Sequence, residues 1–303
     1  MSLLRNNSFI LALALACGIA LGGGADYTRP AVTPLLAFVM TLSLVGISTS
    51  VFSKGKGLIK PALTAVFLNY VLLGGLHIGL AYLLIDDPGL RAGFVLMAAV
   101  PPAVAAIPFT YKLGGDVSFT LVGSVAGHIA AFAVMPLLTV ALLGGSLVDP
   151  IQLVTTLLQL VGAPFLISRL LRMSDRIVAW LDRYRGVLLN WSFFVVVYTI
   201  VGLNRSAFLE FDRAIIPVAI VAFCATFGIA HTVFWASRFV AGSREMRVSY
   251  AVMSAWKNYG LAGAIALTYF GEVAALPTAI TTAFAIITFI VLNTTIAVKT
   301  QTS

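Results

Sequence analysis

Long apolar segments, separated by short charged or turn-rich stretches, limit what this chain can fold into. Hydrophobic residues make up 60% of its 303 residues and charged residues only 10%, whereas a soluble domain has about 25% charged residues. Lipid must therefore be the solvent for most of the chain. Breaks at charges and turns divide it into ten apolar segments, at 8–24, 30–53, 59–85, 92–112, 116–147, 150–172, 186–204, 213–238, 247–271 and 273–298.

These segments favour helices over strands. Most reach the ~20 residues that a helix needs to cross a bilayer, and several would have to tilt. The alternation typical of a membrane barrel is absent, and an open sheet cannot satisfy its backbone in lipid. The sequence therefore predicts an all-α integral membrane protein with ten transmembrane helices. The first segment has no cleavage site in a suitable context, so it is interpreted as a spanning helix.

The charges between the segments predict the orientation. With the N-terminus placed inside, the loops assigned to the cytoplasm are strongly basic and the opposite loops are slightly acidic, as in multi-pass proteins. These loops account for all of the net charge of +8 except one positive charge, that of Lys257, so nucleic acid is not an expected partner. We expect a multi-pass, monomeric protein of the cell membrane, embedded in the lipid bilayer, with both termini cytoplasmic. Cys17 and Cys224 lie in apolar runs without metal-ligand spacing, so no disulfide, metal site or other cofactor is predicted.

Ten spans divide into two blocks of five, and an odd number of spans inverts the second block in the membrane. The expected divisions are the first five-helix repeat at 1–147, the sixth helix with a basic cytoplasmic loop at 148–185, and the remainder of the second repeat at 186–303. In this scheme the fourth and ninth segments correspond. Both contain residues that interrupt a helix.

Three prolines interrupt the fourth segment: Pro101, Pro102 and Pro108. Proline removes a backbone donor and clashes with the preceding turn. A break at membrane depth is tolerated only where it is buried in protein or faces a cavity. One interpretation is a simple kink. The other is a discontinuous helix whose second half presents free N–H groups, and the positive end of its dipole, to an anion.

The ninth segment contains Lys257, the only charged residue assigned to a membrane interior, followed by Asn258, Tyr259 and Gly260. Lys257 lies ten residues after Arg247, which is about 15 Å of helix, so snorkelling to the surface explains it poorly. A lysine at this depth is costly unless it faces a cavity or a partner. No carboxylate is assigned to a membrane interior, so three partners stay open: an anionic ligand, a polar cage, or none if the lysine is deprotonated.

Thr120, Ser124 and His128 follow one another at four-residue spacing, which places them on one face of the fifth segment. They could line a site beside the fourth segment. Alternatively, the hydroxyls bond to helix carbonyls and His128 bonds across helices. His231 has only such a structural interpretation. Neither histidine has the nucleophile–base pair or metal cluster that an intramembrane enzyme would need, so an enzyme is not predicted.

Two motifs resemble the bile acid:sodium symporter family. The family's fourth helix typically has Pro-Gly-Gly-Thr-x-Ser-Asn, then Thr-Tyr-Leu and Gly-Asn/Asp-Val. Its ninth helix typically reads Glu-Val-Gly-Met-Gln-Asn-x-Gly-Leu-Ala. Here the matching stretches are Pro101-Pro102-Ala103-Val104-Ala105-Ala106-Ile107, Thr110-Tyr111-Lys112, Gly115-Asp116-Val117 and Met253-Ser254-Ala255-Trp256-Lys257-Asn258-Tyr259-Gly260-Leu261-Ala262.

The resemblance implies a panel domain and a core domain with broken, crossing fourth and ninth helices, and a substrate site between the domains. It also implies sodium ligands that this chain has partly lost. By position, the family's Ser-Asn pair is Ala106-Ile107, its Glu is Met253 and its Gln is Lys257, while Thr120, Ser124 and Asn258 match. A protonated lysine here would repel sodium. We therefore expect no sodium at the family sites, and Lys257 in the place of the second ion.

The sequence thus predicts a symporter-like secondary transporter of a small organic anion that works by alternating access. It would be sodium-independent, and either facilitative or proton-linked. The anion is expected at the helix N-termini near Pro108 and Tyr259, with Lys257 and Asn258 supplying charge and hydrogen bonds. The alternatives are a sodium-coupled symporter that uses other ligands, a related efflux carrier, and a receptor on the same fold that binds without transporting. The substrate residues are Lys257, Asn258, Tyr259, Ala106, Ile107 and Pro108, and the ion-site or coupling positions are Lys257, Met253, Thr120, Ser124 and His128.

Overall fold

The computed structural model describes residues 7–46, 57–144, 150–209, 213 and 215–296. Within these ranges every regular element is a helix, which confirms the all-α prediction. The boundary expected at 147/148 lies outside the described residues, and so do several charges used to assign the loops: Arg5, Lys54, Lys56, Asp149, Glu210, Asp212 and Lys299.

Seven helical stretches of the described residues are long and apolar enough to cross a membrane, and two shorter apolar helices accompany them. The long stretches are Phe9–Val45, Ile59–Leu84, Val117–Leu143, Val154–Leu171, Asp175–Leu203, Ile215–Phe239 and Glu272–Thr295, and the short ones are Pro88–Ala99 and Tyr259–Tyr269.

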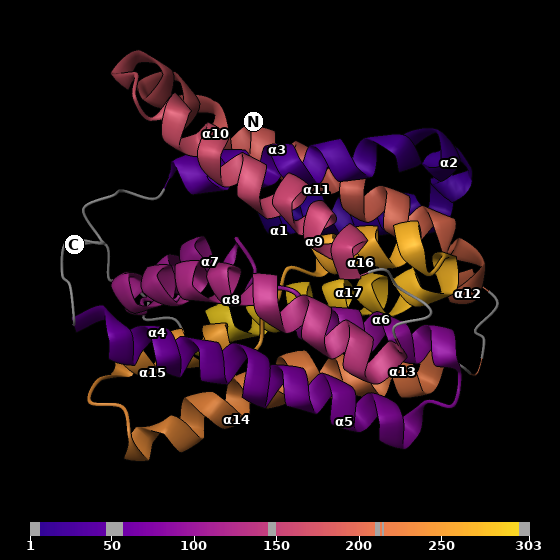
Figure 1. Cartoon of the computed structure of the whole chain (residues 1–303). Helices are drawn as coiled ribbons and strands as arrows, with labels where there is room; N and C mark the ends of the chain where they lie inside the picture. Colours follow the sequence, from indigo (N-terminus) through magenta and orange to yellow (C-terminus); the bar gives the residue numbers. More distant parts are fainter. Residues whose placement is uncertain (1–6, 47–56, 145–149, 210–212, 214, 297–303) are drawn as a thin grey trace.

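The first stretch folds back on itself. As a straight helix its 37 residues would extend about 56 Å, nearly twice the ~30 Å of a hydrocarbon core. It contains α1 (Asn7–Leu21), α2 (Ala25–Thr28) and α3 (Val32–Val45), and Figure 1 places α2 at one end of the molecule. Gly18 of α1 packs on Val201, whereas Gly46 after α3 packs on Arg185, toward the other end of the same partner helix. The stretch therefore makes two antiparallel passes.

That partner helix, α11 (Asp175–Leu203), organises one layer of the molecule. It contacts both α1 and α3, and α3 also contacts α10 (Ala163–Leu171). In Figure 1 these helices lie along the top, whereas α4, α5, α13 and α14 lie along the bottom, with α6, α16 and α17 between them. The other helices are α4 (Ile59–Val66), α5 (Gly74–Leu84), α6 (Pro88–Ala99), α7 (Ala106–Lys112), α8 (Val117–Leu143), α9 (Pro150–Leu157), α12 (Arg205–Leu209), α13 (Ile215–Phe223), α14 (Ile229–Ala236), α15 (Arg244–Met253), α16 (Tyr259–Tyr269) and α17 (Glu272–Thr295).

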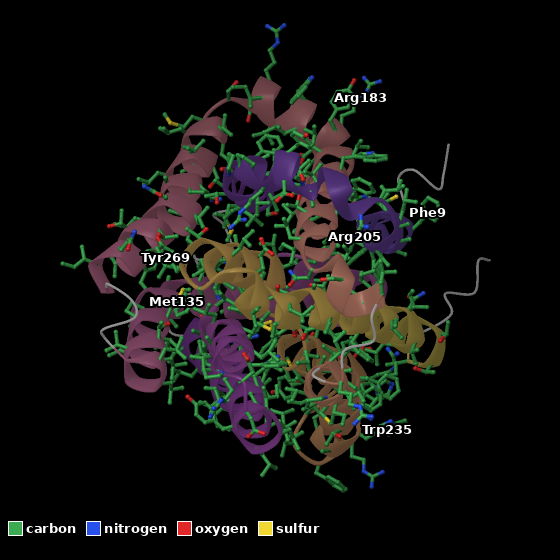
Figure 2. The ribbon with its side chains drawn as sticks, turned by 90° about the vertical axis from the view of Figure 1, so that its right-hand side faces the viewer. Phe9, Met135, Arg183, Arg205, Trp235 and Tyr269 are labelled. Atoms are coloured by element: carbon green, nitrogen blue, oxygen red, sulfur yellow. The ribbon has the colours of Figure 1, made fainter. Side chains whose placement is uncertain are left out.

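Three spanning stretches contain a wider, π-helical turn: η5 (Phe67–Leu73), η6 (Leu158–Gly162) and η7 (Cys224–Gly228). Such turns often lie at functional sites. η5 joins α4 to α5, and η7 joins α13 to α14. Figure 2 shows Arg183 and Trp235 at opposite edges of the molecule, one on each outer layer.

The two short helices are halves of interrupted spans. Residues 100–105 separate α6 from α7, and residues 254–258 separate α15 from α16. Pro101 and Pro102 lie in the first gap, because proline cannot continue a helix. Pro108 does not interrupt anything, contrary to the expectation that all three prolines contribute to the break. It lies in the first turn of α7, where the missing N–H costs no helical hydrogen bond.

The two gaps cross and satisfy each other's backbone. Ala103 N donates to Trp256 O at 3.2 Å, and Asn258 N donates to Pro101 O at 2.9 Å. These bonds form an antiparallel bridge between Pro102 and Lys257. Unwound backbone is tolerated at membrane depth when protein surrounds it. α8 lies close against the crossing, because a Cβ on Gly127 would overlap the Pro102 ring.

Candidate functional site

Lys257 lies at the crossing and is 1% exposed. Its Nζ donates hydrogen bonds to Val100 O at 2.9 Å and to Asn69 Oδ1 at 3.0 Å. The Tyr70 ring centroid is 4.1 Å from Nζ, within the range of a cation–π contact. Three acceptors thus face the three N–H bonds of an ammonium. Of the three partners left open by the sequence, the structure contains the polar cage.

Asn69, on η5, holds the cage together. Its Nδ2 donates to Met253 O at 3.0 Å and to Trp256 O at 3.3 Å, while its Oδ1 accepts from Lys257. The amide therefore bridges the last carbonyl of α15, the unwound segment after it, and the lysine. Tyr70 is oriented by a 2.8 Å bond from its hydroxyl to Gly127 O on α8.

The cage lies where helix dipoles favour a positive charge. Val100 caps the C-terminus of α6, and Met253 is the last residue of α15. Carbonyls at these ends carry the negative end of each dipole. Among the described residues the ion pairs join Arg29 to Glu272 and Arg185 to Asp182, so no carboxylate pairs with Lys257.

Two cavities flank the crossing. The wider one, of about 600 Å³, lies among α3, α7, α8 and α11 and has polar groups such as Lys112 and Arg185 on its wall. The narrower one, of about 100 Å³, lies among α1, α11, α16 and α17 and is almost entirely apolar. Four residues line both and therefore form the wall between them: Val104, Ala105, Phe109 and Phe193.

The predicted substrate residues are divided between these cavities. Ile107 and Pro108 line the wider one, whereas Asn258 and Tyr259 line the narrower one. Lys257 also borders the narrower cavity, but its Nζ is bonded within the cage. Ala106 is fully buried and is not among the residues lining either cavity.

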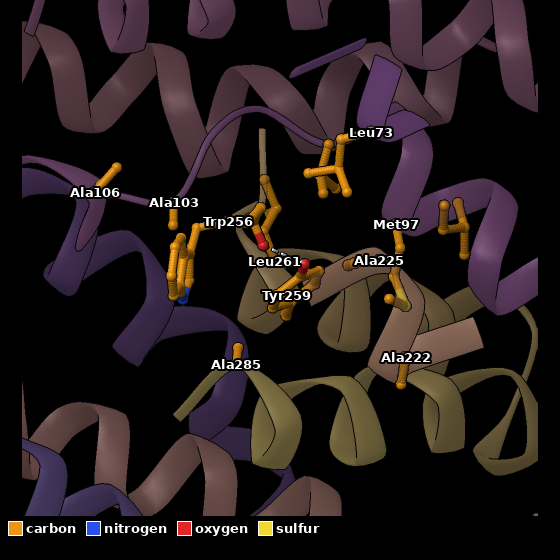
Figure 3. Packing of buried hydrophobic residues seen from close by; sticks show 14 of the residues in the cluster. Leu73, Met97, Ala103, Ala106, Ala222, Ala225, Trp256, Tyr259, Leu261 and Ala285 are labelled. Carbon is orange, nitrogen blue, oxygen red and sulfur yellow. Dashed lines mark hydrogen bonds between the residues drawn. The ribbon is translucent and has the colours of Figure 1, made fainter. Parts of the chain in front are cut away.

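The N-terminus of α16 is already capped. Asn258 Oδ1 accepts from Leu261 N at 3.1 Å, and the Tyr259 hydroxyl donates to Ala255 O at 3.1 Å. The oxygen of the Asn258 amide therefore serves the helix itself, and its NH₂ group is the part that could donate to an anion. Figure 3 shows Trp256 beside Ala103 at the crossing, with Tyr259 close by.

The predicted coupling positions also separate into two groups. Thr120 is fully buried and bonds to Thr110 at 2.9 Å and to Asp116 O at 3.3 Å, while Met253 is fully buried and its methyl faces Gly123. Ser124 and His128 instead line the wider cavity. His128 Nδ1 lies 2.7 Å from Ser124 O, and its buried Nε2 has no partner among the described residues.

Three residues at the crossing were not predicted: Asn69, Tyr70 and His77. His77 is fully buried, its Nδ1 lies 3.0 Å from Leu73 O, and its ring is 6.2 Å from that of Tyr259. Asn69 could have been found, because it is a lone amide in the middle of an apolar segment. No group of three or more histidine, cysteine, aspartate or glutamate side chains within the described part of the chain is placed to hold a metal.

The comparisons agree with the resemblance seen in the sequence. The model of the SBF-like CPA transporter family matches residues 7–297, nearly the whole chain. This confirms the resemblance to transporters of the bile acid:sodium symporter type. No curated protein matches the chain.

Proposed function

We propose that this chain, which belongs to the SBF-like CPA transporter family, is a secondary carrier that moves a small organic anion by alternating access without sodium. The observation that carries the proposal is the position of the Lys257 amino group, on Val100 O and Asn69 Oδ1 between two broken helices. In transporters with discontinuous helices, unwound carbonyls and half-helix C-termini hold the coupling cation. A protonated lysine there supplies a positive charge that is covalently attached to the chain.

The fate of the neighbouring ion position supports the same conclusion. The hydroxyls of Thr110 and Thr120 bond to each other. Met253 brings a methyl group where the family has a carboxylate. Neither arrangement leaves a ring of free oxygen ligands, and an ammonium nearby would repel a second cation. We propose that coupling is absent or uses protons.

The cavities favour an anion with a hydrophobic body. Trp256 Nε1, which can only donate, is buried without a partner among the described residues and borders the narrower cavity. His128 Nε2 is likewise buried without a partner among the described residues, and His128 lines the wider cavity. The Trp256 N–H suits a carboxylate, and so does His128 when its ring is protonated, because Nδ1 already donates to Ser124 O. The surrounding walls are largely apolar. Ile107, Pro108, Asn258 and Tyr259 would form the walls around the substrate.

For the molecule as a whole we propose ten spans in two inverted five-helix repeats. The π-helical turns η5 and η7 lie in the third and eighth spans, and the gaps at 100–105 and 254–258 lie in the fourth and ninth. Corresponding irregularities at corresponding positions are expected of inverted repeats. The layer of α1, α3, α10 and α11 would be the panel domain and the other helices the core. We further propose a monomer in the cell membrane with cytoplasmic termini.

Transport by reconstituted protein tests the proposal. A thermal-shift screen of carboxylates, repeated across pH and sodium concentration, identifies the probe. Its uptake into proteoliposomes is then measured with and without a sodium gradient. We expect uptake that is independent of sodium and is abolished by Lys257→Ala, because the crossing then lacks its positive charge. Sodium-dependent uptake that survives Lys257→Ala would overturn the proposal.

The same measurement separates the alternatives. If the chain is a sodium-coupled symporter with other ligands, uptake requires a sodium gradient in the natural protein and in the Lys257→Ala variant. If it is a proton-linked carrier, uptake responds to an imposed pH gradient. An efflux carrier moves the probe out of the cytoplasmic side rather than into it, driven by its coupling gradient. A receptor on this fold binds the probe in the thermal-shift screen but gives no counterflow.

A further inference from the structure

A third cavity, of about 470 Å³, lies away from the crossing in the outer layer. α3 contacts both α10 and α11, while α10 and α11 hardly contact each other. The two helices therefore form the walls of a groove and α3 forms its floor. The groove has the volume of a small-molecule site, and its lining is almost entirely apolar. Residues on its three sides include Phe38 and Leu42 of α3, Ile167 and Leu171 of α10, and Ile177 and Trp180 of α11.

The groove follows α10 and α11 toward the charged end of α11. Helix α11 has 29 residues, about 43 Å, which exceeds the ~30 Å hydrocarbon core. Residues 186–203 carry no charge, whereas 175–185 contain Asp175, Arg176, Asp182, Arg183 and Arg185. The uncharged part therefore spans the hydrocarbon, and the charged part lies at headgroup level. On η6 and α10 the groove extends from residue 159 to 171, about 18 Å of helix.

Arginines surround the interfacial end of this groove. Arg169 and Arg172 donate to Leu44 O and Val45 O, which holds both at the C-terminus of α3. Arg176 is exposed, has no ion pair among the described residues, and lies one helical turn before the groove residue Trp180. Trp180 is 56% exposed, as expected of an aromatic side chain at headgroup level.

An apolar groove that ends at a basic rim suits an anion with a long apolar body. We infer that the groove binds an anionic phospholipid, with an acyl chain between α10 and α11 and the phosphate on Arg172 and Arg176. Basic pockets between transmembrane helices recognise anionic headgroups. A zwitterionic lipid would bring a second, positive charge to the same rim and bind more weakly. The inference concerns the outer layer and is independent of the transported substrate.

Lipid binding to the purified full-length protein tests the inference. Native mass spectrometry in detergent compares phosphatidylglycerol with phosphatidylcholine of the same acyl chains. We expect tighter binding of phosphatidylglycerol. Arg176→Gln should weaken phosphatidylglycerol binding about fivefold, the effect of one basic residue near a lipid surface. It should weaken phosphatidylcholine binding less, because the choline already offsets the charge of the phosphate. Ala163→Phe, which adds a ring on the α10 wall of the groove, should weaken the binding of both lipids.

Arg238→Gln is the matched control. It removes the same charge from an exposed position on the 3-10 turn after α14, beside the Trp235 edge that lies opposite Arg183 in Figure 2. We expect no change in either lipid. Three results would overturn the inference: equal binding of the two lipids, an equal loss for Arg238→Gln and Arg176→Gln, and binding of glycerol 3-phosphate as tight as that of the lipid. Thermal unfolding of each variant verifies that the fold is retained.

Discussion

At the scale of single residues, the cage depends on an amide that serves three partners at once. Asn69 accepts from Lys257 and donates to the last carbonyl of α15 and to one carbonyl of the unwound segment. Removing one partner of a buried charge leaves that charge uncompensated, which costs about 3–5 kcal/mol. We therefore predict that Asn69→Leu destabilises the protein by about 3 kcal/mol, measured by unfolding in detergent.

The cage also predicts that the two residues are energetically coupled. In the double variant Asn69→Leu/Lys257→Met the uncompensated amine is gone, so part of the lost stability should return. We expect the double variant to be more stable than the sum of the single effects by roughly 1 kcal/mol or more, since residues in one network are not additive. Strictly additive effects would show that the hydrogen bond between the two side chains contributes nothing.

At the scale of helices, the close approach of α8 to the crossing determines whether the two gaps can meet. A Cβ on Gly127 would overlap Cγ and Cδ of Pro102, a rigid ring in the unwound segment. Gly127→Ala should push α8 away from the crossing and destabilise the protein by about 1–3 kcal/mol, the usual cost of overpacking. The thermal unfolding temperature and the rate of probe uptake should both decrease.

Gly75→Ala is the matched control for this prediction. Gly75 lies in helix α5, where an added Cβ has no neighbour within 4 Å. The same substitution there should leave stability unchanged or raise it by about 0.4–1 kcal/mol, because alanine reduces the entropy of the unfolded chain. If both variants behaved alike, contact with Pro102 would not be what makes Gly127 important.

At the scale of the whole molecule, the two cavities lie on opposite sides of one wall. Lys112, Asp182 and Arg185 line the wider one, whereas the charged residue on the narrower one, Lys257, is bonded within the cage. Ile107 in the wider cavity and Thr282 in the narrower one are both partly buried. In a protein whose Cys17 and Cys224 are replaced by serine, we predict that Ile107→Cys reacts with a charged thiol reagent several-fold faster than Thr282→Cys.

Phe193 gives this prediction its control. It lines both cavities, so Phe193→Ala should open the wall and raise the labelling rate of Thr282→Cys toward that of Ile107→Cys. Equal labelling of the two cysteines before that change would contradict a closed wall.

Several features were accessible from the pattern of residues alone. Apolar segments predicted an all-helical protein because helices and closed barrels are the structures that satisfy their backbone in lipid, and the alternation of a barrel is absent. Pro101 and Pro102 predicted a break because a proline cannot donate to a helix. The depth of Lys257 could be estimated by counting residues from Arg247. The role of Pro108 could not be predicted. A proline in the first turn of a helix and one that ends a helix look alike in the sequence until the start of the helix is known.

The site residues were less predictable, because their orientation depends on neighbours distant in the chain. Thr120 and Ser124 share a helical face, yet one bonds to Thr110 and the other lines a cavity. Asn258 follows a lysine in an apolar segment, and nothing in that arrangement indicates that its amide would cap α16. Local spacing specifies which residues share a face, but the packing of other helices decides what that face meets.

Lys257 illustrates what the sequence determines and what it leaves open. Composition and spacing alone place a charge at mid-span and require a partner for it, since lipid cannot solvate an ammonium. They leave open whether the partner is a ligand or the protein. Only the tertiary structure decides, because the two acceptors are separated from Lys257 by 188 and 157 positions in the chain. Such contacts arise when helices cross, and no local pattern encodes which helices will cross.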